Sequence, residues 1–451
     1  MIGWHDADAV AGALNSPEPL RVRRARDRKP STTRTRGPKA ERGPSRGAMA
    51  AAGASGREAA APLVKMANNR YADTDEPRRH ARQRLRAHLW ERLRPDDHRV
   101  AKCGRVRVGV DPVIALGADG SAHYRGLQTC GSVTACPVCA AKIRQARAEE
   151  IDEGLARHLS DGGGAVFLTL TMPHDAGMGL EAVWGAVSGS WASLVSGRHR
   201  ATLRDRFGLV GYVRSTEVTH GRAGWHPHLH VLLFTDRHLG LDDLAALHLF
   251  VRERWIRRVV ALGFRAPGIH TGVRILPVTG ADGMGAYLTK VGDDEGPAHT
   301  PGVELARWDL KRGRSWGSRS PFRILEDHAR DGEAADWRLF TEWLVVSKGR
   351  RTLEWSRGLR ALLLPHDRDR TDEEIAADHE PAEEVAIVSA DVWRALVARR
   401  LSVLALAAVE RAGVGGLLVL ARRAGLPVEL RAGDLGPPRL VMNITEGGHD
   451  G

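Results

Sequence analysis

The stretch His226-Pro227-His228-Leu229-His230-Val231-Leu232-Leu233-Phe234 decides how the centre of this chain folds. Histidines alternate with hydrophobic residues, and this pattern predicts a β-strand, because side chains two positions apart lie on one face of a strand. His226, His228 and His230 therefore share a face, while the intervening hydrophobic side chains point into the core. Packing three protonatable rings together is costly without a purpose. The strand therefore predicts a metal site rather than structural histidines.

The sequence on both sides of this strand alternates between strand and helix patterns. Alternating hydrophobic and β-branched residues predict strands over 165–172, 209–220, 226–234 and 268–278. Hydrophobic residues at helical spacing predict helices over 181–207, 241–262 and 281–291. This order predicts an α+β fold. Its first six elements match the ferredoxin-like arrangement, an antiparallel sheet with helices on one face.

A carboxylate is expected to join the histidines. Glu217 lies on the preceding predicted strand, and the turn Gly221–Trp225 separates it from the histidine strand. A hairpin would bring Glu217 opposite the imidazoles. Two histidines and one carboxylate with open positions suit a hard divalent ion such as Mg²⁺ or Mn²⁺, which accepts a phosphate oxygen. The alternative is that Glu217 pairs with an arginine.

All four cysteines lie in one short region, at Cys103, Cys130, Cys136 and Cys139. Cys136-Pro137-Val138-Cys139 is a knuckle in which two thiolates bind one ion, and the other two cysteines would complete a tetrahedral site. Structural zinc is the prediction. The alternative is four unrelated thiols, since a full zinc ribbon has two CxxC pairs. A redox role is disfavoured because no thioredoxin-like pattern surrounds the motif.

The charge of the chain favours a polyanionic partner. Its 67 Lys and Arg outnumber 55 Asp and Glu, giving a net charge of +12. Nucleic acid is the first candidate and an anionic membrane surface the second. Only 8 of the basic residues are Lys, which indicates a GC-rich coding bias and weakens the argument from arginine. With no apolar run near about 18 residues and no secretory signal pattern, a soluble cytoplasmic protein is expected.

Composition divides the chain into six segments. A disordered basic tail is predicted because residues 21–46 carry eleven basic and two acidic residues among Pro, Ser and Gly. This tail is either dispensable or a nonspecific DNA-binding arm. An acidic stretch with ten acids and two arginines is predicted to be a linker. The segments are the tail 1–65, a helical four-cysteine region 66–160, an α+β domain 161–295, an extension 296–365, the linker 366–391, and a helical region 392–451 whose helices pack or oligomerise.

Tyr287 and Lys290 are three residues apart on a predicted helix and therefore share a face. Tyrosine is a poor nucleophile because its pKa is about 10. A nearby ammonium favours the phenolate, and a metal that polarises a phosphate helps the attack. Alone, this spacing is typical of a surface helix. The spacing supports a catalytic role only because the histidine strand lies upstream in the same domain.

Three motifs occur in a fixed order: Phe167-Leu168-Thr169-Leu170-Thr171, the histidine strand, and Tyr287-Leu288-Thr289-Lys290. This order resembles the HUH endonuclease superfamily, and most closely the rolling-circle replication initiators of actinomycete plasmids. The resemblance covers about residues 80–365. It implies an HUH core preceded by a zinc-binding element and followed by a DNA-binding extension. It also implies that His228 and His230 bind the metal, that Glu217 matches a recurrent acid, and that His226 lies outside the minimal motif.

The resemblance implies a site-specific nicking-closing endonuclease acting on single-stranded or hairpin origin DNA. Tyr287 would attack the scissile phosphate, leaving a 5′-phosphotyrosine link and a 3′-OH primer, while Lys290 stabilises the developing charge. Host helicase and DNA polymerase are the further partners implied, and no membrane is. Gly283 stands where such initiators often carry the acid that activates water for the second cleavage.

Origin recognition is expected from the extension. Ser320 is a predicted helix N-cap with Pro321 at the first helical position. Arginines of this region are expected to contact phosphates, the alternative being generic surface charge. They are Arg319, Arg323, Arg350, Arg351 and Arg357.

Three other functions stay open. A transposase or mobilisation relaxase of the same superfamily often has two tyrosines in its third motif, whereas Leu288 and Thr289 offer none. A non-catalytic, zinc-stabilised DNA-binding regulator predicts that Tyr287→Phe has no effect. A metal-dependent phosphohydrolase would turn over without covalent attachment.

Overall fold

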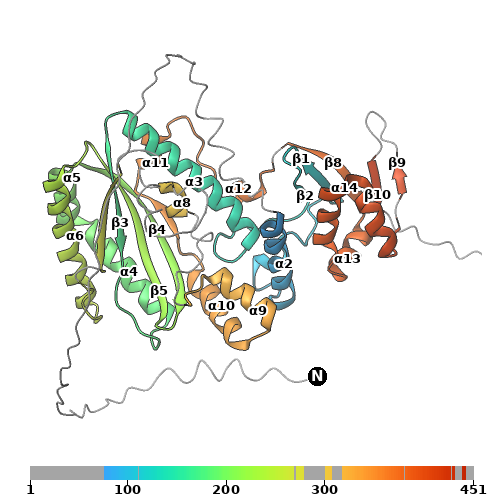
Figure 1. Cartoon of the computed structure of the whole chain (residues 1–451), viewed down its shortest axis with the longest axis horizontal. Helices are drawn as coiled ribbons and strands as arrows, with labels where there is room; N and C mark the ends of the chain where they lie inside the picture. Colours follow the sequence, from blue (N-terminus) through green and yellow to red (C-terminus); the bar gives the residue numbers. More distant parts are fainter. Residues whose placement is uncertain are drawn as a thin grey trace, which may run out of the picture. The chain divides into compact units, whose positions relative to one another are not determined.

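The computed structural model of the chain describes residues 76–109, 111–268, 271–278, 300–306, 317–379, 381–427, 429–431 and 439–442 (Figure 1). Several residues singled out in the sequence lie outside this part of the chain. They are the basic tail 1–65, Gly283, Tyr287 and Lys290, together with the helix predicted over 281–291.

A five-stranded antiparallel sheet positions the histidine strand. Its strands lie in the order β6-β3-β5-β4-β7. They are β3 (Gly164–Leu170), β4 (Leu209–Gly221), β5 (Gly224–Thr235), β6 (Val273–Val278) and β7 (Leu353–Trp355). The four strands predicted from alternation are confirmed, although β6 is shorter than expected, and the mixed α+β class is confirmed. The short edge strand β7 was not predicted.

One face of this sheet packs against α4 (Leu180–Leu194), α5 (Gly197–Phe207) and α6 (Leu241–Ala261). The hydrophobic residues between the histidines of β5 enter this core beside Trp191 and Trp255. The helix predicted over 181–207 is two helices, because α4 ends at Leu194 and a new helix begins at Gly197, whose φ is +51°.

The opposite face is also covered, by α3 (Pro137–Ser160), α8 (Pro301–Ala306) and α11 (Leu359–Leu363) (Figure 1). The helices between the core strands therefore lie on one face as predicted, whereas the cover on the other face comes from flanking segments and was not predicted. Beyond the histidines, Leu232 and Phe234 of β5 are buried on the histidine face. That half of the strand is hydrophobic on both sides, so it needs cover on both sides.

A second five-stranded sheet combines segments that are distant in sequence. Its order is β2-β1-β8-β10-β9, and all its pairs are antiparallel except β8 with β10. The strands are β1 (Val113–Gly117), β2 (Ala122–Arg125), β8 (Ala382–Val388), β9 (Glu429–Arg431) and β10 (Arg439–Met442). Helices α13 (Ala390–Ala398) and α14 (Ser402–Arg423) pack against it.

The acidic segment 366–391 differs from the predicted linker. It contains α12 (Asp372–Ala377) and strand β8. Thr371 and Glu374 form a capping box, and three acids occupy the first turn of α12, where they complement the helix dipole. Ile375 and Val385 are buried. The acidic residues thus lie on the solvent-facing sides of an ordered helix and strand. Strands β9 and β10 likewise mean that 392–451 is not purely helical.

Helix α14 is long and apolar enough to cross a membrane by length and composition, contrary to the expectation that no such stretch exists, and 33% of its most apolar stretch is buried. Ala412 and Gly413 interrupt its helical backbone, close to the break predicted near Gly413–Gly416. The helix also contacts β2 and β8. These contacts support the predicted packed helix pair.

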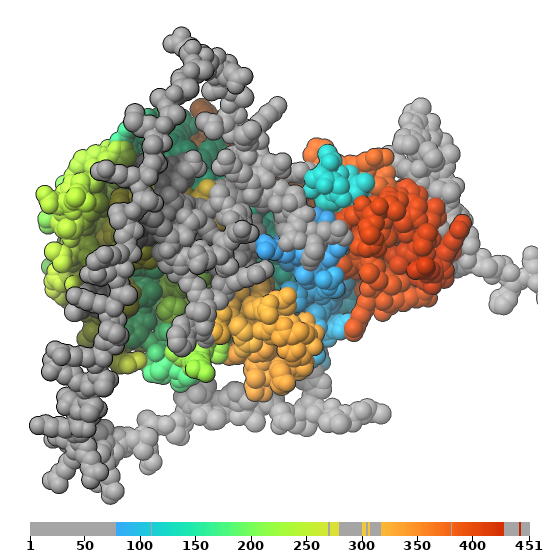
Figure 2. All heavy atoms as spheres, in the orientation of Figure 1, coloured from blue at the N-terminus to red at the C-terminus, as the bar shows by residue number. Residues whose placement is uncertain are grey.

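Helices α9 (Pro321–Asp331) and α10 (Ala334–Ser347) pack beside the tip of the β4–β5 hairpin (Figure 2). The N-cap prediction is confirmed, because the Ser320 side chain accepts a hydrogen bond from the Arg323 amide. On α10, the carboxylate of Glu342 accepts bonds from Leu180 N at 2.7 Å and Trp225 Nε1 at 2.8 Å. One side chain thus ties α10 to the start of α4 and the start of β5.

Candidate metal centres

The β4–β5 hairpin brings the predicted carboxylate to the histidines. Glu217 pairs directly with His228, and the hairpin closes at Gly221 and Gly224. Gly224 has a φ of +83°, and a Cβ there would meet backbone atoms of Asp175 and Ala176 at 3.0 Å. The tight turn thus depends on glycine, and it sets the register that places Glu217 opposite His228.

Glu217, His228 and His230 form a close triad. The Nε2 atoms of the two histidines are 3.1 Å apart, and Glu217 Oε2 lies 3.4 Å from that of His228 and 3.2 Å from that of His230. Ligand atoms about 2.1 Å from one ion lie roughly 3.0–3.4 Å apart. The three atoms are therefore spaced like ligands of one ion.

The other ring nitrogens of the triad face polar groups. His230 Nδ1 lies 3.4 Å from Thr169 Oγ1 on β3, and His228 Nδ1 lies 3.5 Å from the carbonyl of His226. A proton on each Nδ1 would be directed to these oxygens. Both Nε2 lone pairs then point to the position shared with Glu217, as in metal-binding histidines.

His226 contacts a fourth histidine instead of joining the triad. Its Nδ1 is 3.3 Å from Nδ1 of His174, which follows β3. Burial, followed by the charges of His228 and His174, lowers the pKa of His226 to about 3, so its ring is neutral at ordinary pH. His174 was not predicted, and its only signal in the sequence is that it lies two residues after a predicted strand.

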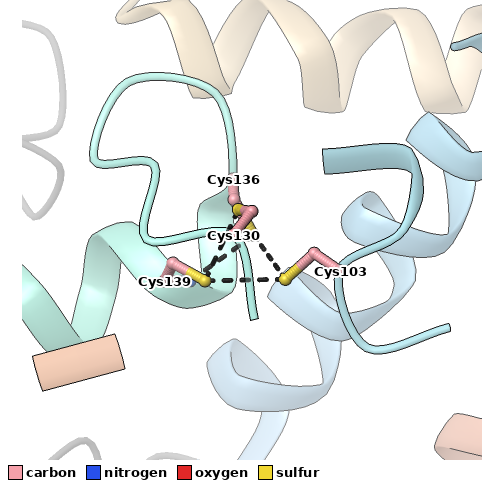
Figure 3. Close-up of side chains that lie close together, drawn as sticks. All are labelled: Cys103, Cys130, Cys136 and Cys139. Carbon is pink, nitrogen blue, oxygen red and sulfur yellow. Dashed lines mark hydrogen bonds between the residues drawn. The ribbon is translucent and has the colours of Figure 1, made fainter. Parts of the chain in front are cut away.

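The four cysteines come together as predicted (Figure 3). Cys103 follows the short helix η1 (Arg99–Ala101), and Cys136 is the N-cap of α3. The sulfur of Cys103 lies 3.7 Å from that of Cys136 and 3.5 Å from that of Cys139, which is 3.7 Å from that of Cys130. Sulfurs about 2.3 Å from a tetrahedral zinc are roughly 3.8 Å apart. The cluster has nearly this geometry.

The surroundings of the cysteines are those of a structural site. All four are buried, in a core shared with Trp184, Phe340 and Trp343. The Cys139 amide donates to Cys136 Sγ at 3.5 Å, which stabilises that sulfur. Burial raises the pKa of the Cys136 thiol, so a thiolate there needs a compensating cation.

Three of the five expected DNA-binding arginines are engaged within the protein. Arg319 donates to both carboxylate oxygens of Asp336, at 2.7 and 2.8 Å, and to Asp327 at 3.1 Å. These hydrogen bonds, with Asp336 first, raise the pKa of Arg319. Its backbone also bridges to His220. Arg319 is therefore a structural residue, because its guanidinium neutralises two buried carboxylates.

Of the other arginines, all but Arg350 are more accessible than Arg319. Arg323 pairs with Asp327 at 3.1 Å, and Arg350 pairs with Glu181. Arg351 and Arg357 are exposed, with no ion pair to any residue in the described ranges. Thr216 N donates to Thr352 O, just before β7 begins at Leu353.

The segment matched by a family model described as replication protein is residues 124–239, which contain the triad and three of the cysteines. The chain is 30% identical over 401 residues to "Protein rep" of Streptomyces lividans, covering 72% of this chain and 86% of that protein. It is 32% identical over 146 residues to a "Neomycin resistance protein" of Streptomyces cyanogenus, covering 27% of this chain and 33% of that protein. No solved structure matches. The chain therefore belongs to the replication (Rep) proteins of actinomycete plasmids.

Proposed function

We propose that this Rep protein starts rolling-circle replication as an HUH-type nicking-closing endonuclease. The triad carries the proposal: Glu217, His228 and His230 present ligand atoms 3.1–3.4 Å apart on adjacent strands. The strand order β6-β3-β5-β4 supports a ferredoxin-like core, since it is the order that a split βαβ unit produces.

The triad fits a divalent ion, Mg²⁺ or Mn²⁺, which when bound would supply positive charge to a phosphate oxygen. Tyr287 would attack the phosphorus with its phenolate oxygen. The bond to the 3′ oxygen breaks, the 3′-OH leaves as a primer, and the 5′-phosphate stays on Tyr287. Lys290 would favour the phenolate and offset the charge of the transition state. Because the phosphotyrosine retains the energy of the broken ester, a 3′-OH can later displace the tyrosine and reseal the strand.

The cysteine cluster is proposed to hold a structural zinc ion. Its four sulfurs are buried at the start of α3, and α3 packs on the histidine face of the sheet. A closed four-thiolate site leaves no position for a substrate. The zinc would therefore hold α3 and its neighbours in place without taking part in cleavage.

Single-stranded or hairpin origin DNA is the proposed substrate. Arg351 and Arg357 are the best placed of the expected contacts, with Arg323 and Arg350 at the margins, whereas Arg319 is withdrawn from this set. In this proposal, residues 161–295 form the nicking domain and residues 296–365 form a DNA-binding extension. Host helicase and DNA polymerase would act next on the unwound origin, in the cytoplasm.

The test uses labelled single-stranded oligonucleotides that tile the plasmid carrying this gene, incubated with the full chain and Mn²⁺. A denaturing gel should show one covalent protein–DNA adduct. Tyr287→Phe and His228→Ala should abolish it, and Tyr212→Phe, which alters a β4 residue of the α4–α6 core, should keep it. Multiple turnover without an adduct would indicate a phosphohydrolase. Specific binding that Tyr287→Phe leaves intact, with no cleavage by either protein, would indicate a regulator.

A further inference from the structure

On four strands, the side chains of the histidine face change from hydrophobic to polar at the same row of paired residues. On β5 the side chains of this face change from Phe234 and Leu232 to His230 and His228. The partner strands change in step, because directly paired residues share a face. Phe167 is followed by Thr169 on β3, Val213 by Ser215 on β4, and Leu276 by Arg274 on β6.

The hydrophobic side of this boundary is packed. Phe167, Leu232 and Val213 belong to the core under α3, α8 and α11, and Leu276 packs against it. The polar side begins with one continuous row across the sheet. In this row Arg274 pairs with Thr169, Thr169 with His230, and His230 with Ser215.

Arg274 is the cation of this row, and its side chain is exposed. Its neighbours Val273 and Ile275 belong to the opposite core, which fixes Arg274 on the metal-binding face. Strands lie about 4.8 Å apart, so the backbone of Arg274 is about 10 Å from that of His230. A phosphate next to one held at the triad would therefore lie within reach of a long side chain.

We propose that Arg274 binds a backbone phosphate of the strand being cut, adjacent to the scissile phosphate. This subsite rests on the proposed nicking function and adds a contact that the extension does not supply. A guanidinium suits this role because it bonds two phosphate oxygens at once. The DNA strand would then cross the β-strands with Arg274 on the β6 side of the triad.

The test measures binding without cleavage, using full-length Tyr287→Phe protein, Mn²⁺ and a fluorescent single-stranded oligonucleotide of the plasmid that this protein binds. Adding Arg274→Ala should weaken the Kd about tenfold and lower the slope of log affinity against log salt by about 0.7. Arg274→Lys should restore part of the affinity. Arg198→Ala removes an exposed arginine of α5, on the opposite side of the sheet, and should change neither quantity.

Replacing single phosphates by uncharged methylphosphonates locates the contact. At one position beside the scissile phosphate, the replacement should weaken binding to protein that has Arg274 but leave the Arg274→Ala protein unaffected. Equal affinity and salt slope with and without Arg274 would overturn the subsite, provided that the unfolding temperature and Mn²⁺ affinity are unchanged. The covalent-adduct assay reports separately on nicking, so a missing adduct with an intact Arg274 effect would reject only the nicking function.

Discussion

At the scale of single residues, the orientation of His230 depends on a neighbour that is not itself a ligand. Thr169 lies directly opposite His230 on β3, and its hydroxyl is 3.4 Å from Nδ1. If this oxygen accepts the Nδ1 proton, the lone pair of Nε2 is directed to the position shared with Glu217 and His228. Such partners of histidine ligands influence metal affinity without touching the metal.

Replacing Thr169 by Val keeps the shape of the side chain and removes the acceptor. Mn²⁺ affinity, measured by titration calorimetry, should fall about 10-fold. Thr202→Val, on the exposed side of α5, serves as the control and should not change it. An unchanged affinity in Thr169→Val would mean that packing alone orients His230.

At the scale of elements, Arg319 holds the start of α9 and the tip of the β4–β5 hairpin together. It bonds Asp327 on α9 and Asp336 on α10, and its backbone pairs with His220 on β4. Both carboxylates are largely buried, at 6% and 9% exposure. Removing the guanidinium would take from Asp336 the group that bonds both of its oxygens, while Asp327 would keep its pairs with Arg323 and Arg330.

Arg319→Ala should therefore lower the free energy of unfolding by about 1–3 kcal/mol, measured by urea denaturation. Arg338→Ala, an exposed residue of α10, should change it little. At a temperature where Arg319→Ala is folded, its affinity for origin DNA should equal that of the parent. Unchanged stability with lost DNA affinity would restore Arg319 to the DNA-binding set.

The elements also show which parts of the fold the sequence determines locally. Alternation and a glycine-bounded turn are local signals, so they correctly predicted the hairpin and the pairing of Glu217 with the histidines. The histidine face is covered by α3 and α8, which are far apart in sequence. No local sequence pattern predicts that these helices pack on the sheet. The acidic segment was misjudged because its charges cap α12 or face solvent, while the few buried residues, such as Ile375 and Val385, are widely spaced.

At the scale of the whole molecule, the cysteine cluster lies where several distant segments meet. Its core includes Leu89 of α2 (Glu76–Arg92), Trp184 of α4, Ile324 of α9 and Trp343 of α10. A metal ion bound there would connect the segment after η1, the loop at Cys130 and the start of α3, against which these helices pack. The stability of this region should therefore depend on the metal.

Strong chelation, or Cys136→Ser, should remove one zinc ion per chain, as measured by elemental analysis. The unfolding temperature should then fall by several degrees, since about 1 kcal/mol corresponds to about 2–4 °C in a domain of 150–250 residues. Glu217→Gln, in the other candidate metal site, should leave the zinc content unchanged. Purified protein with no zinc and no response to chelators would contradict the structural zinc site.

The second sheet has a consequence for how the protein is made. Val113 of β1 pairs with Ile387 of β8, and the backbone amide of Ala122 on β2 donates to Glu410 on α14. At roughly 5–20 residues per second, the ribosome delivers β8 on the order of 15–50 s after β1. During that interval the edge of β1 has no partner and can pair with another nascent chain. Translation speed, and any chaperone that shields this edge, should therefore govern the yield of folded protein.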